Sequence, residues 1–218
     1  MLFAAVMLLE CMVIRRGIVH PLLEYNESIH HGVIAPIHGV AELRTLAETY
    51  NSIYEENEER EILMKHQAEH DSLTELLNRR SFDQILSLYE KDRSSFALIL
   101  ADVDVFKQIN DTCGHDTGDR ILKRVAALLH TTFRSIDYVC RIGGDEFVAF
   151  VVDEPPRTVR ERMSQLVANV EANGYSVAVG CATCSAGGIQ LEALIKQAES
   201  RMYDDKEEHY RRRGIPHG

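Results

Sequence analysis

The chain contains 218 residues, of which 45% are hydrophobic and 27% are charged. This composition excludes disorder over the whole length, because it supplies enough apolar surface to bury a core. The formal net charge of −10 argues against a general nucleic-acid binder, because Lys and Arg carry most of the affinity for a polyphosphate backbone. A nucleotide substrate stays compatible with this charge, since a bound divalent metal ion lets carboxylates lie beside phosphates.

Five cysteines are scattered along the chain and include one Cys-x-x-Cys pair, Cys181 and Cys184. We interpret this pair as small hydrophobic residues of a core, because no second pair of Cys or His stands at a zinc-like spacing in the sequence. The odd number of cysteines also argues against a secreted disulfide framework and favours a reducing compartment.

The first segment, residues 2–14, is apolar apart from Glu10 and is followed by Arg15 and Arg16. It is shorter than the roughly 20 residues that span a bilayer, but an apolar run with a basic pair after it is typical of the cytoplasmic end of a membrane helix. We therefore expect residues 1–17 to be the end of a truncated transmembrane helix. The rest of the chain is then cytoplasmic and tethered to the membrane.

Residues 18–57 have a helical pattern that is broken near residues 32–39, which predicts two helices joined by a connector. In the second helix, one stripe is suited to pairing with another helix and predicts a homodimer; its members are Leu43, Leu46, Tyr50 and Ile53. The acidic residues that follow are typical of a solvated helix face. Residues 58–70 are thus expected to continue as a signalling helix or coiled coil.

A second domain is predicted for residues 71–210, followed by a basic tail at 211–218. Asp71 is a candidate N-cap for a helix that reaches about Tyr89. The later elements are expected as strands at 96–101, 138–142, 147–152 and 176–182 and as helices at 116–133, 157–173 and 191–208. Their βαββαβ order predicts an α+β domain with a ferredoxin-like antiparallel sheet.

Two carboxylates of this domain are placed for metal chemistry. Asp102 ends the first strand, and Asp145 follows Gly143 and Gly144 in the hairpin turn. Neighbouring strands lie about 5 Å apart, so the two carboxylates can share Mg²⁺, which takes oxygen ligands from carboxylates and substrate phosphates. The two glycines remove side chains that would obstruct a phosphate. An isolated Asp in a turn is otherwise a cap or turn former.

Four motifs then occur in an order that resembles the GGDEF family of diguanylate cyclases over about residues 70–208. They are DSLTELLNRR at 71–80, DVDVFKQIND at 102–111, GHDTGD at 114–119 and RIGGDEF at 141–147. The resemblance implies a homodimer that condenses two GTP into cyclic di-GMP with release of two pyrophosphates. The acidic chain is expected to bind neither DNA nor RNA.

The resemblance also implies roles for single residues. Asp102, Asp145 and the backbone carbonyl of Val103 would bind Mg²⁺, with Mn²⁺ as an alternative ion. Glu146 would assist at the same centre, and Arg141 would support charge near the reacting phosphorus.

The substrate-binding residues implied by the resemblance come from three of these motifs and from the C-terminal part of the chain. Asn110 and Asp119 would bind guanine, because an amide can pair with a purine ring acceptor and a carboxylate accepts hydrogen bonds from the N1 and N2 donors of guanine. Gly143 and Gly144 would admit the phosphates, which Lys107 and Lys206 would contact. Tyr210 stands where the family usually has a phosphate-binding Arg, and Arg211 is a candidate substitute. This departure affects the expected GTP affinity and turnover rate more than the fold.

A further pair, Arg134 and Asp137, resembles the inhibitory product site of the family, where cyclic di-GMP binds. An Arg can donate a forked pair of hydrogen bonds to guanine, and an Asp can accept from the same base. The structural alternative is an Arg at a helix C-terminus next to an Asp that starts a strand.

Residues 18–57 resemble a HAMP linker, with an ordinary helical dimerisation hairpin as the alternative. The matching residues are Pro21, Glu42, Leu43, Leu46, Tyr50 and Asn51.

Two other functions compete with the cyclase. One is a catalytically silent receptor for cyclic di-GMP, which the retained carboxylates disfavour, and the other is a cyclase with altered base choice, which Asp119 disfavours.

Overall fold

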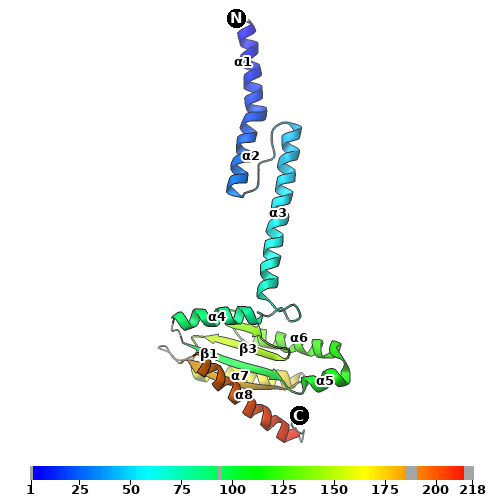
Figure 1. The fold of residues 1–218 in the computed structure, drawn as a ribbon, viewed down its shortest axis with the longest axis vertical. Coiled ribbons are helices and arrows are strands. Elements are labelled where there is room, and N and C mark those ends of the chain that lie inside the picture. Colours follow the sequence, from blue (N-terminus) through cyan, green and yellow to red (C-terminus); the bar gives the residue numbers. More distant parts are fainter. Residues whose placement is uncertain (1, 93–94, 185–190, 214–218) are drawn as a thin grey trace. The chain divides into compact units, whose positions relative to one another are not determined.

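The computed structural model describes residues 2–92, 95–184 and 191–213. The chain divides into two compact units, residues 1–66 and 67–218, which are described separately (Figure 1). The sequence prediction put the start of the second domain at about residue 70.

The first unit is helical. Its elements are α1 (Leu2–Ile14), the π-helical segment η1 (Arg15–Val19), α2 (His20–His31) and α3 (Ala41–Glu69), the last of which extends past the end of the unit. The expected pair of helices with a connector is thus present. The helix α2 ends where Gly32 adopts a left-handed conformation with φ of 59°, which suits a residue without a Cβ. None of the described helices combines the length and apolar character needed to cross a membrane.

The connector between α2 and α3 is fixed by a small core and one buried amide. Tyr25, Ala35 and Ala47 form this core. The Asn51 side chain accepts a hydrogen bond from the Ala35 N–H at 2.7 Å and donates one to the Ala35 carbonyl at 2.8 Å. This satisfies both backbone groups of a buried residue that has no helix or strand partner.

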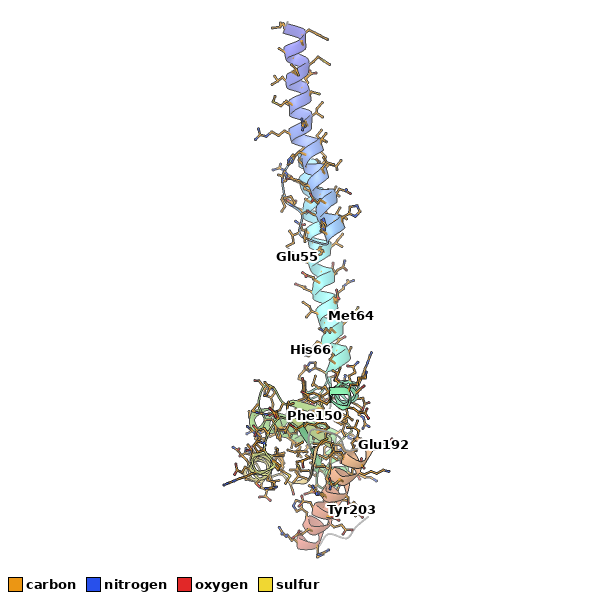
Figure 2. All side chains as sticks on the ribbon, turned by 90° about the vertical axis from the view of Figure 1, so that its left-hand side faces the viewer. Glu55, Met64, His66, Phe150, Glu192 and Tyr203 are labelled. Carbon is orange, nitrogen blue, oxygen red and sulfur yellow. The ribbon has the colours of Figure 1, made fainter. Side chains whose placement is uncertain are left out.

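The predicted pairing stripe on α3 divides into two sets. Leu43 and Tyr50 pack against the connector core, whereas Leu46 and Ile53 are exposed. Farther along the helix, Glu55, Met64 and His66 project from α3 (Figure 2). The unit therefore leaves part of the stripe available for another chain.

The second unit has the expected ferredoxin-like βαββαβ order, with an antiparallel four-stranded sheet in the order β2-β3-β1-β4. Its elements are α4 (Arg79–Asp92), β1 (Phe96–Val103), α5 (Phe106–Cys113), α6 (His115–Thr132), β2 (Tyr138–Arg141), β3 (Glu146–Val152), α7 (Pro156–Ala172), β4 (Val177–Cys184) and α8 (Leu191–Arg213). The predicted fold class is confirmed.

The sheet is covered on both faces, which explains the continuous apolar run of β1. Ile99 packs with α6 and α7 on one face, and the neighbouring Leu98 packs with α4 and α8 on the other. The side chain of Phe150 lies inside the unit, and that of Tyr203 stands on the exposed side of α8 (Figure 2). Cys181 and Cys184 pack against opposite clusters, which agrees with their interpretation as core residues.

The first helix of this unit begins later than expected. Asp71 accepts hydrogen bonds from the N–H and hydroxyl of Thr74 and so stabilises a turn. Asn78 caps α4 instead, because its side-chain oxygen accepts from the Ser81 N–H at 3.0 Å. The prediction of Asp71 as the helix cap was wrong, since a short polar side chain bonds equally well to the backbone of a turn.

Candidate active site

Strand pairing brings the two acidic motifs to one edge of the sheet. Asp102 lies opposite Glu146 in the β1–β3 register. One residue farther on, the Val103 N–H donates to the backbone carbonyl of Asp145 at 3.2 Å. The hairpin turn is therefore fixed against the end of β1 by backbone hydrogen bonds, and the predicted metal-binding residues lie next to one another.

Burial makes Asp102 the electrostatic centre of this edge. Burial raises the pKa of the carboxyl, Lys206 lowers it, and Asp145 and Glu146 raise it, which leaves the pKa at about 6. Lys206 Nζ lies 2.5 Å from Asp102 Oδ1. A buried carboxylate with two acidic neighbours requires a cation, and the lysine supplies one here.

The donor set fits a hard divalent ion, which prefers carboxylate and carbonyl oxygens. Asp102, Asp145 and the Val103 carbonyl supply such oxygens. Among the described residues, however, no three acidic groups at this edge have ligand oxygens within 4.8 Å of one another. The carboxylates are thus neighbours that an ion would still have to draw together.

Two residues shape the Gly-Gly turn. A Cβ on Gly143 would overlap the Glu146 carboxylate, whereas one on Gly144 would meet open space. Arg141 donates to the Gly144 carbonyl at 2.7 Å and to Asp71 Oδ1 at 2.9 Å. Arg141 therefore holds the turn against the 71–78 loop, so the contacts in this structure give it a positioning role.

The predicted guanine-binding residues lie where α5 and α6 meet. Gly118 is buried, and a Cβ there would overlap the side-chain oxygen of Asn110. That oxygen is buried and has no hydrogen-bond partner among the described residues. Asp119 and Lys107 are exposed. The arrangement leaves a buried acceptor for a donor from a ligand.

Sequence reasoning missed a second buried carboxylate, that of Asp104, two residues after Asp102. Asp104 is 2% exposed and accepts a hydrogen bond from the Ser176 hydroxyl. His209 Nδ1 lies 2.8 Å from the same carboxylate. Lys206 and His209 thus reach Asp102 and Asp104 from successive turns of α8. The available indication was the Asp-x-Asp spacing at the end of β1, because residues two apart in an extended chain face the same side.

Backbone strain marks the segment between these carboxylates and α5. Val105 has φ of 52°, a left-handed conformation that a β-branched residue rarely adopts. Such conformations persist only where the surrounding structure holds them, and they concentrate at functional sites.

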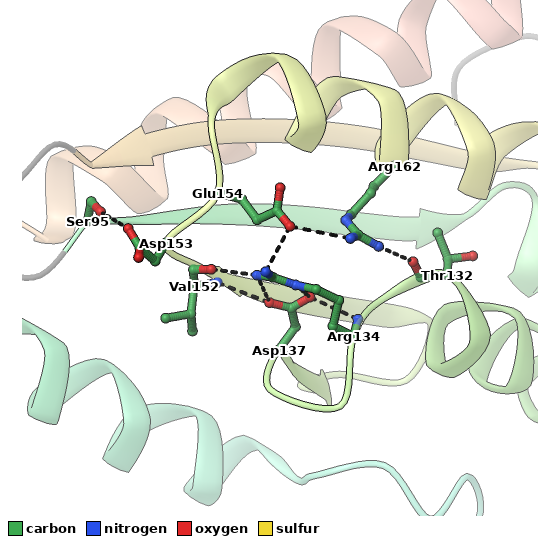
Figure 3. Close-up of polar contacts among 8 residues, drawn as sticks. All are labelled: Ser95, Thr132, Arg134, Asp137, Val152, Asp153, Glu154 and Arg162. Atoms are coloured by element: carbon green, nitrogen blue, oxygen red, sulfur yellow. Dashed lines mark hydrogen bonds and ion pairs between the residues drawn. The ribbon is translucent and has the colours of Figure 1, made fainter.

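The proposed product-binding pair forms an internal clamp (Figure 3). Asp137 has no exposed side-chain surface and accepts from the Arg134 guanidinium at 2.9 and 3.1 Å and from the Val152 N–H at 3.2 Å. Arg134 is 30% exposed and also contacts Glu154 at 2.8 Å, and Glu154 in turn pairs with Arg162. Asp137 therefore orients Arg134, which is the member of the pair open to solvent.

The clamp predicts a pH-dependent loss of stability in the variant Asp137→Asn. Burial raises the Asp137 pKa, but the hydrogen bonds from Arg134 and Val152 outweigh it and lower the pKa overall. This stabilisation is complete above the unfolded pKa of about 3.9 and is lost as the pH falls through the lower native value. At pH 7 the variant should lose roughly 3 kcal/mol of unfolding free energy.

Urea denaturation of the Asp137 variant from pH 7 to pH 3 measures this effect. The difference from the unsubstituted chain should shrink as the solution becomes acidic. Asp83→Asn is the matched control, because Asp83 is an exposed partner of Arg79. A difference that stays constant over this range would contradict the assigned role of Asp137.

The fold and the site together define an α+β domain whose acidic sheet edge suits a cation and phosphates. Residues 68–212 match the family described as "Diguanylate cyclase, GGDEF domain", which is more than half of the chain. The chain therefore belongs to the GGDEF family, and the resemblance seen in the four motifs is confirmed.

Individual relatives agree with this assignment. Diguanylate cyclase DosC of Escherichia coli (strain K12) is 36% identical over 157 residues, covering 66% of this chain and 34% of the relative. Diguanylate cyclase TpbB of Pseudomonas aeruginosa (strain UCBPP-PA14) is 36% identical over 154 residues, covering 62% of this chain and 35% of the relative. The chain thus spans about a third of the length of these curated relatives.

A solved structure with the same fold contains the coiled coil and GGDEF domain of DgcB from Caulobacter crescentus, in complex with c-di-GMP. It has a TM-score of 0.65 and 25% sequence identity, and the match covers 75% of this chain and 94% of that chain.

Proposed function

We propose that this chain is a diguanylate cyclase, which condenses two GTP into cyclic di-GMP and two pyrophosphates across a homodimer. The observation that carries the proposal is the pairing of Asp102 with Glu146, which joins the strand-end carboxylate to the Gly-Gly-Asp-Glu turn. Membership of the GGDEF family supports the same activity.

The base preference rests on Asn110 and Asp119. The buried, unpartnered oxygen of Asn110 and the exposed carboxylate of Asp119 are acceptors, and guanine offers donors at N1 and N2. Adenine offers no donor at N1, so a pocket with unpaired acceptors disfavours it.

Magnesium is part of this proposal, with Mn²⁺ as an alternative. Asp102, Asp145 and the Val103 carbonyl would hold the ion beside Glu146, where it would neutralise charge on the phosphates. Lys206, now paired with Asp102, would then be available to phosphate, together with Lys107. Arg141 would keep the turn in place during the reaction.

Dimerisation is proposed because attack by a 3′-hydroxyl on an α-phosphorus requires two half-sites that face each other. Joining two domains raises their effective concentration and fixes their orientation. The exposed Leu46 and Ile53 on α3 support helix pairing in the 18–57 segment, whose HAMP-like character stays a prediction. Membrane association also stays a prediction, supported by α1, which has no buried residue.

Product inhibition is proposed at Arg134, oriented by Asp137. A cavity of about 380 Å³ lies beside this pair and is also lined by His70, Glu75 and His130. Its mixture of cationic and acidic groups is suited to a guanine base and a phosphate.

In the variant Arg134→Ala, about tenfold or more cyclic di-GMP should be needed to halve the initial rate. The reason is that a forked contact to guanine contributes about 1–3 kcal/mol. The measurement is the initial rate with added product. Arg157→Ala is the control, because Arg157 is an exposed partner of Glu161 on α7. Unchanged inhibition in a folded Arg134 variant would show that product does not bind at Arg134.

An experiment on base choice tests the proposed function. The purified chain is supplied with equal concentrations of GTP and ATP in the presence of Mg²⁺, and the products are resolved by mass. We expect GTP to be consumed and ATP to remain. Equal consumption of both would favour the cyclase with altered base choice, and binding of cyclic di-GMP without any turnover would favour the silent receptor.

A further inference from the structure

Three potential metal ligands come together in the first unit, outside the GGDEF domain. Glu24 Oε2 lies 3.3 Å from His20 Nδ1 and 2.5 Å from His38 Nε2. The ligand atoms of the three residues all lie within 4.8 Å of one another, and no other such group of three His, Cys, Asp or Glu occurs among the described residues.

Two ligands come from one face of α2. His20 and Glu24 are four residues apart, so their side chains are neighbours on the helix surface. The helix turn before His20 is the π-helical segment η1. A single π-turn inside an α-helix is rare and occurs frequently at functional sites.

The third ligand comes from the connector, which is held close to α2. Gly39 has φ of 97°, and a Cβ there would lie 3.2 Å from the Gly17 carbonyl oxygen and from two atoms of Pro21. The backbone on either side of this contact is also fixed. The Val40 N–H donates to the Gly17 carbonyl at 3.3 Å, and the Tyr25 hydroxyl donates to the His38 carbonyl. His38 is therefore positioned by its surroundings.

The acceptor atom at the centre of the group is under-satisfied. Glu24 Oε2 is shielded from solvent and makes no hydrogen bond of normal geometry among the described residues, although an imidazole nitrogen lies on either side. A buried carboxylate oxygen in this situation is suited to a cation.

We propose that His20, Glu24 and His38 bind Zn²⁺ or a similar first-row divalent ion. Two imidazoles and one carboxylate form a known type of zinc ligand set that leaves a fourth position open. Imidazole ligands favour Zn²⁺, Ni²⁺ and Cu²⁺ over Mg²⁺ and Ca²⁺. Tetrahedral ligands at 2.0–2.2 Å from zinc lie about 3.4 Å apart. His20 is already near that distance from Glu24, and the partly exposed His38 side chain can move outward to reach it.

Solvent access agrees with this proposal. A cavity of about 660 Å³ adjoins His20 and His38 and is also lined by Met12, Arg15 and Arg16, so water or an anion can reach these two ligands. A bound ion would tie the connector to α2 through His38. The competing explanation is a metal-free cluster in which protonated imidazoles pair with Glu24.

Cobalt binding to the full chain, purified without a histidine tag, tests the proposal. Tetrahedral Co²⁺ gives visible absorption bands, and competition with Zn²⁺ then reports zinc affinity. We expect one ion per chain and a zinc affinity that falls at least about 100-fold in His38→Ala. Loss of a residue that only hydrogen-bonds a metal ligand lowers metal affinity by about 10- to 100-fold, so a larger fall indicates loss of a ligand. His30→Ala should bind as the unsubstituted chain does, because His30 is an exposed residue of the same helix outside the cluster.

Glu24→Gln separates loss of a metal ligand from loss of folding, because it keeps the size of the side chain and removes its charge. A loss of metal affinity with an unchanged circular dichroism spectrum supports the site. Equal zinc affinity in the unsubstituted chain, His38→Ala and Glu24→Gln would overturn it. Absence of the cobalt bands at saturating Co²⁺ would also overturn it and would leave the metal-free cluster as the explanation.

Discussion

Asp102→Asn should lower the rate of cyclic di-GMP formation by about 100-fold or more, the scale at which loss of one preorganised electrostatic group slows an enzyme. The substitution keeps the shape of the side chain but removes the buried negative charge that faces Asp145, Glu146 and Lys206. An amide cannot replace that charge as a ligand for Mg²⁺. Initial rates at saturating GTP and Mg²⁺ measure the effect.

Asp83→Asn controls for the loss of a carboxylate at an exposed position on α4, and its rate should match that of the unsubstituted chain. Urea denaturation shows whether the Asp102 variant is folded at the assay temperature. A folded variant that keeps more than about a third of the rate would remove Asp102 from the catalytic site.

Gly180→Ala should reduce the free energy of unfolding by about 3 kcal/mol or more, at the upper end for an overpacked core. Gly180 lies on β4 where α8 crosses it, and an added Cβ would overlap the Ala198 carbonyl and the Met202 N–H. Both obstacles are backbone atoms, so relief requires movement of the helix. That helix also carries Lys206 to the site, so activity should fall with stability.

Gly144→Ala is the matched control for stability, because a Cβ there meets nothing within 4 Å and Gly144 does not have a positive φ. Midpoints of urea denaturation for the two variants give the comparison. A Gly180 variant as stable as the Gly144 variant would show that β4 and α8 do not pack as closely as described.

Most of the domain fold followed from local patterns in the sequence. The apolar run of β1, the Gly-Gly hairpin and the periodic face of α6 each predict one element, and their order predicts the topology. The helix α5 was missed, because its eight residues are too few for a periodic pattern and it follows the strained Val105.

The candidate site was predictable in composition but not in contacts. The motifs identified Asp102 and Asp145, yet no local pattern indicates that Lys206, more than a hundred positions away, pairs with Asp102. His209 and Asp104 meet over a similar separation. Such contacts depend on how α8 packs across the sheet, which periodicity does not encode.

The Arg134–Asp137 pair shows the same limit at short range. The spacing identified both residues as potential ligands, but Asp137 is fully buried and bonded within the chain. Side-chain exposure, which the sequence does not report, separates the residue that can meet a ligand from the one that orients it.

The central claim is the condensation of two GTP, and the balance of its products tests it most directly. The purified chain is incubated with GTP and Mg²⁺, and cyclic di-GMP and pyrophosphate are quantified together. We predict two pyrophosphates released for each cyclic di-GMP formed, and a rate of product formation that is lower by about 100-fold or more in Asp102→Asn. Release of orthophosphate, or unconsumed GTP from a folded dimer of the unsubstituted chain, would contradict the proposed function.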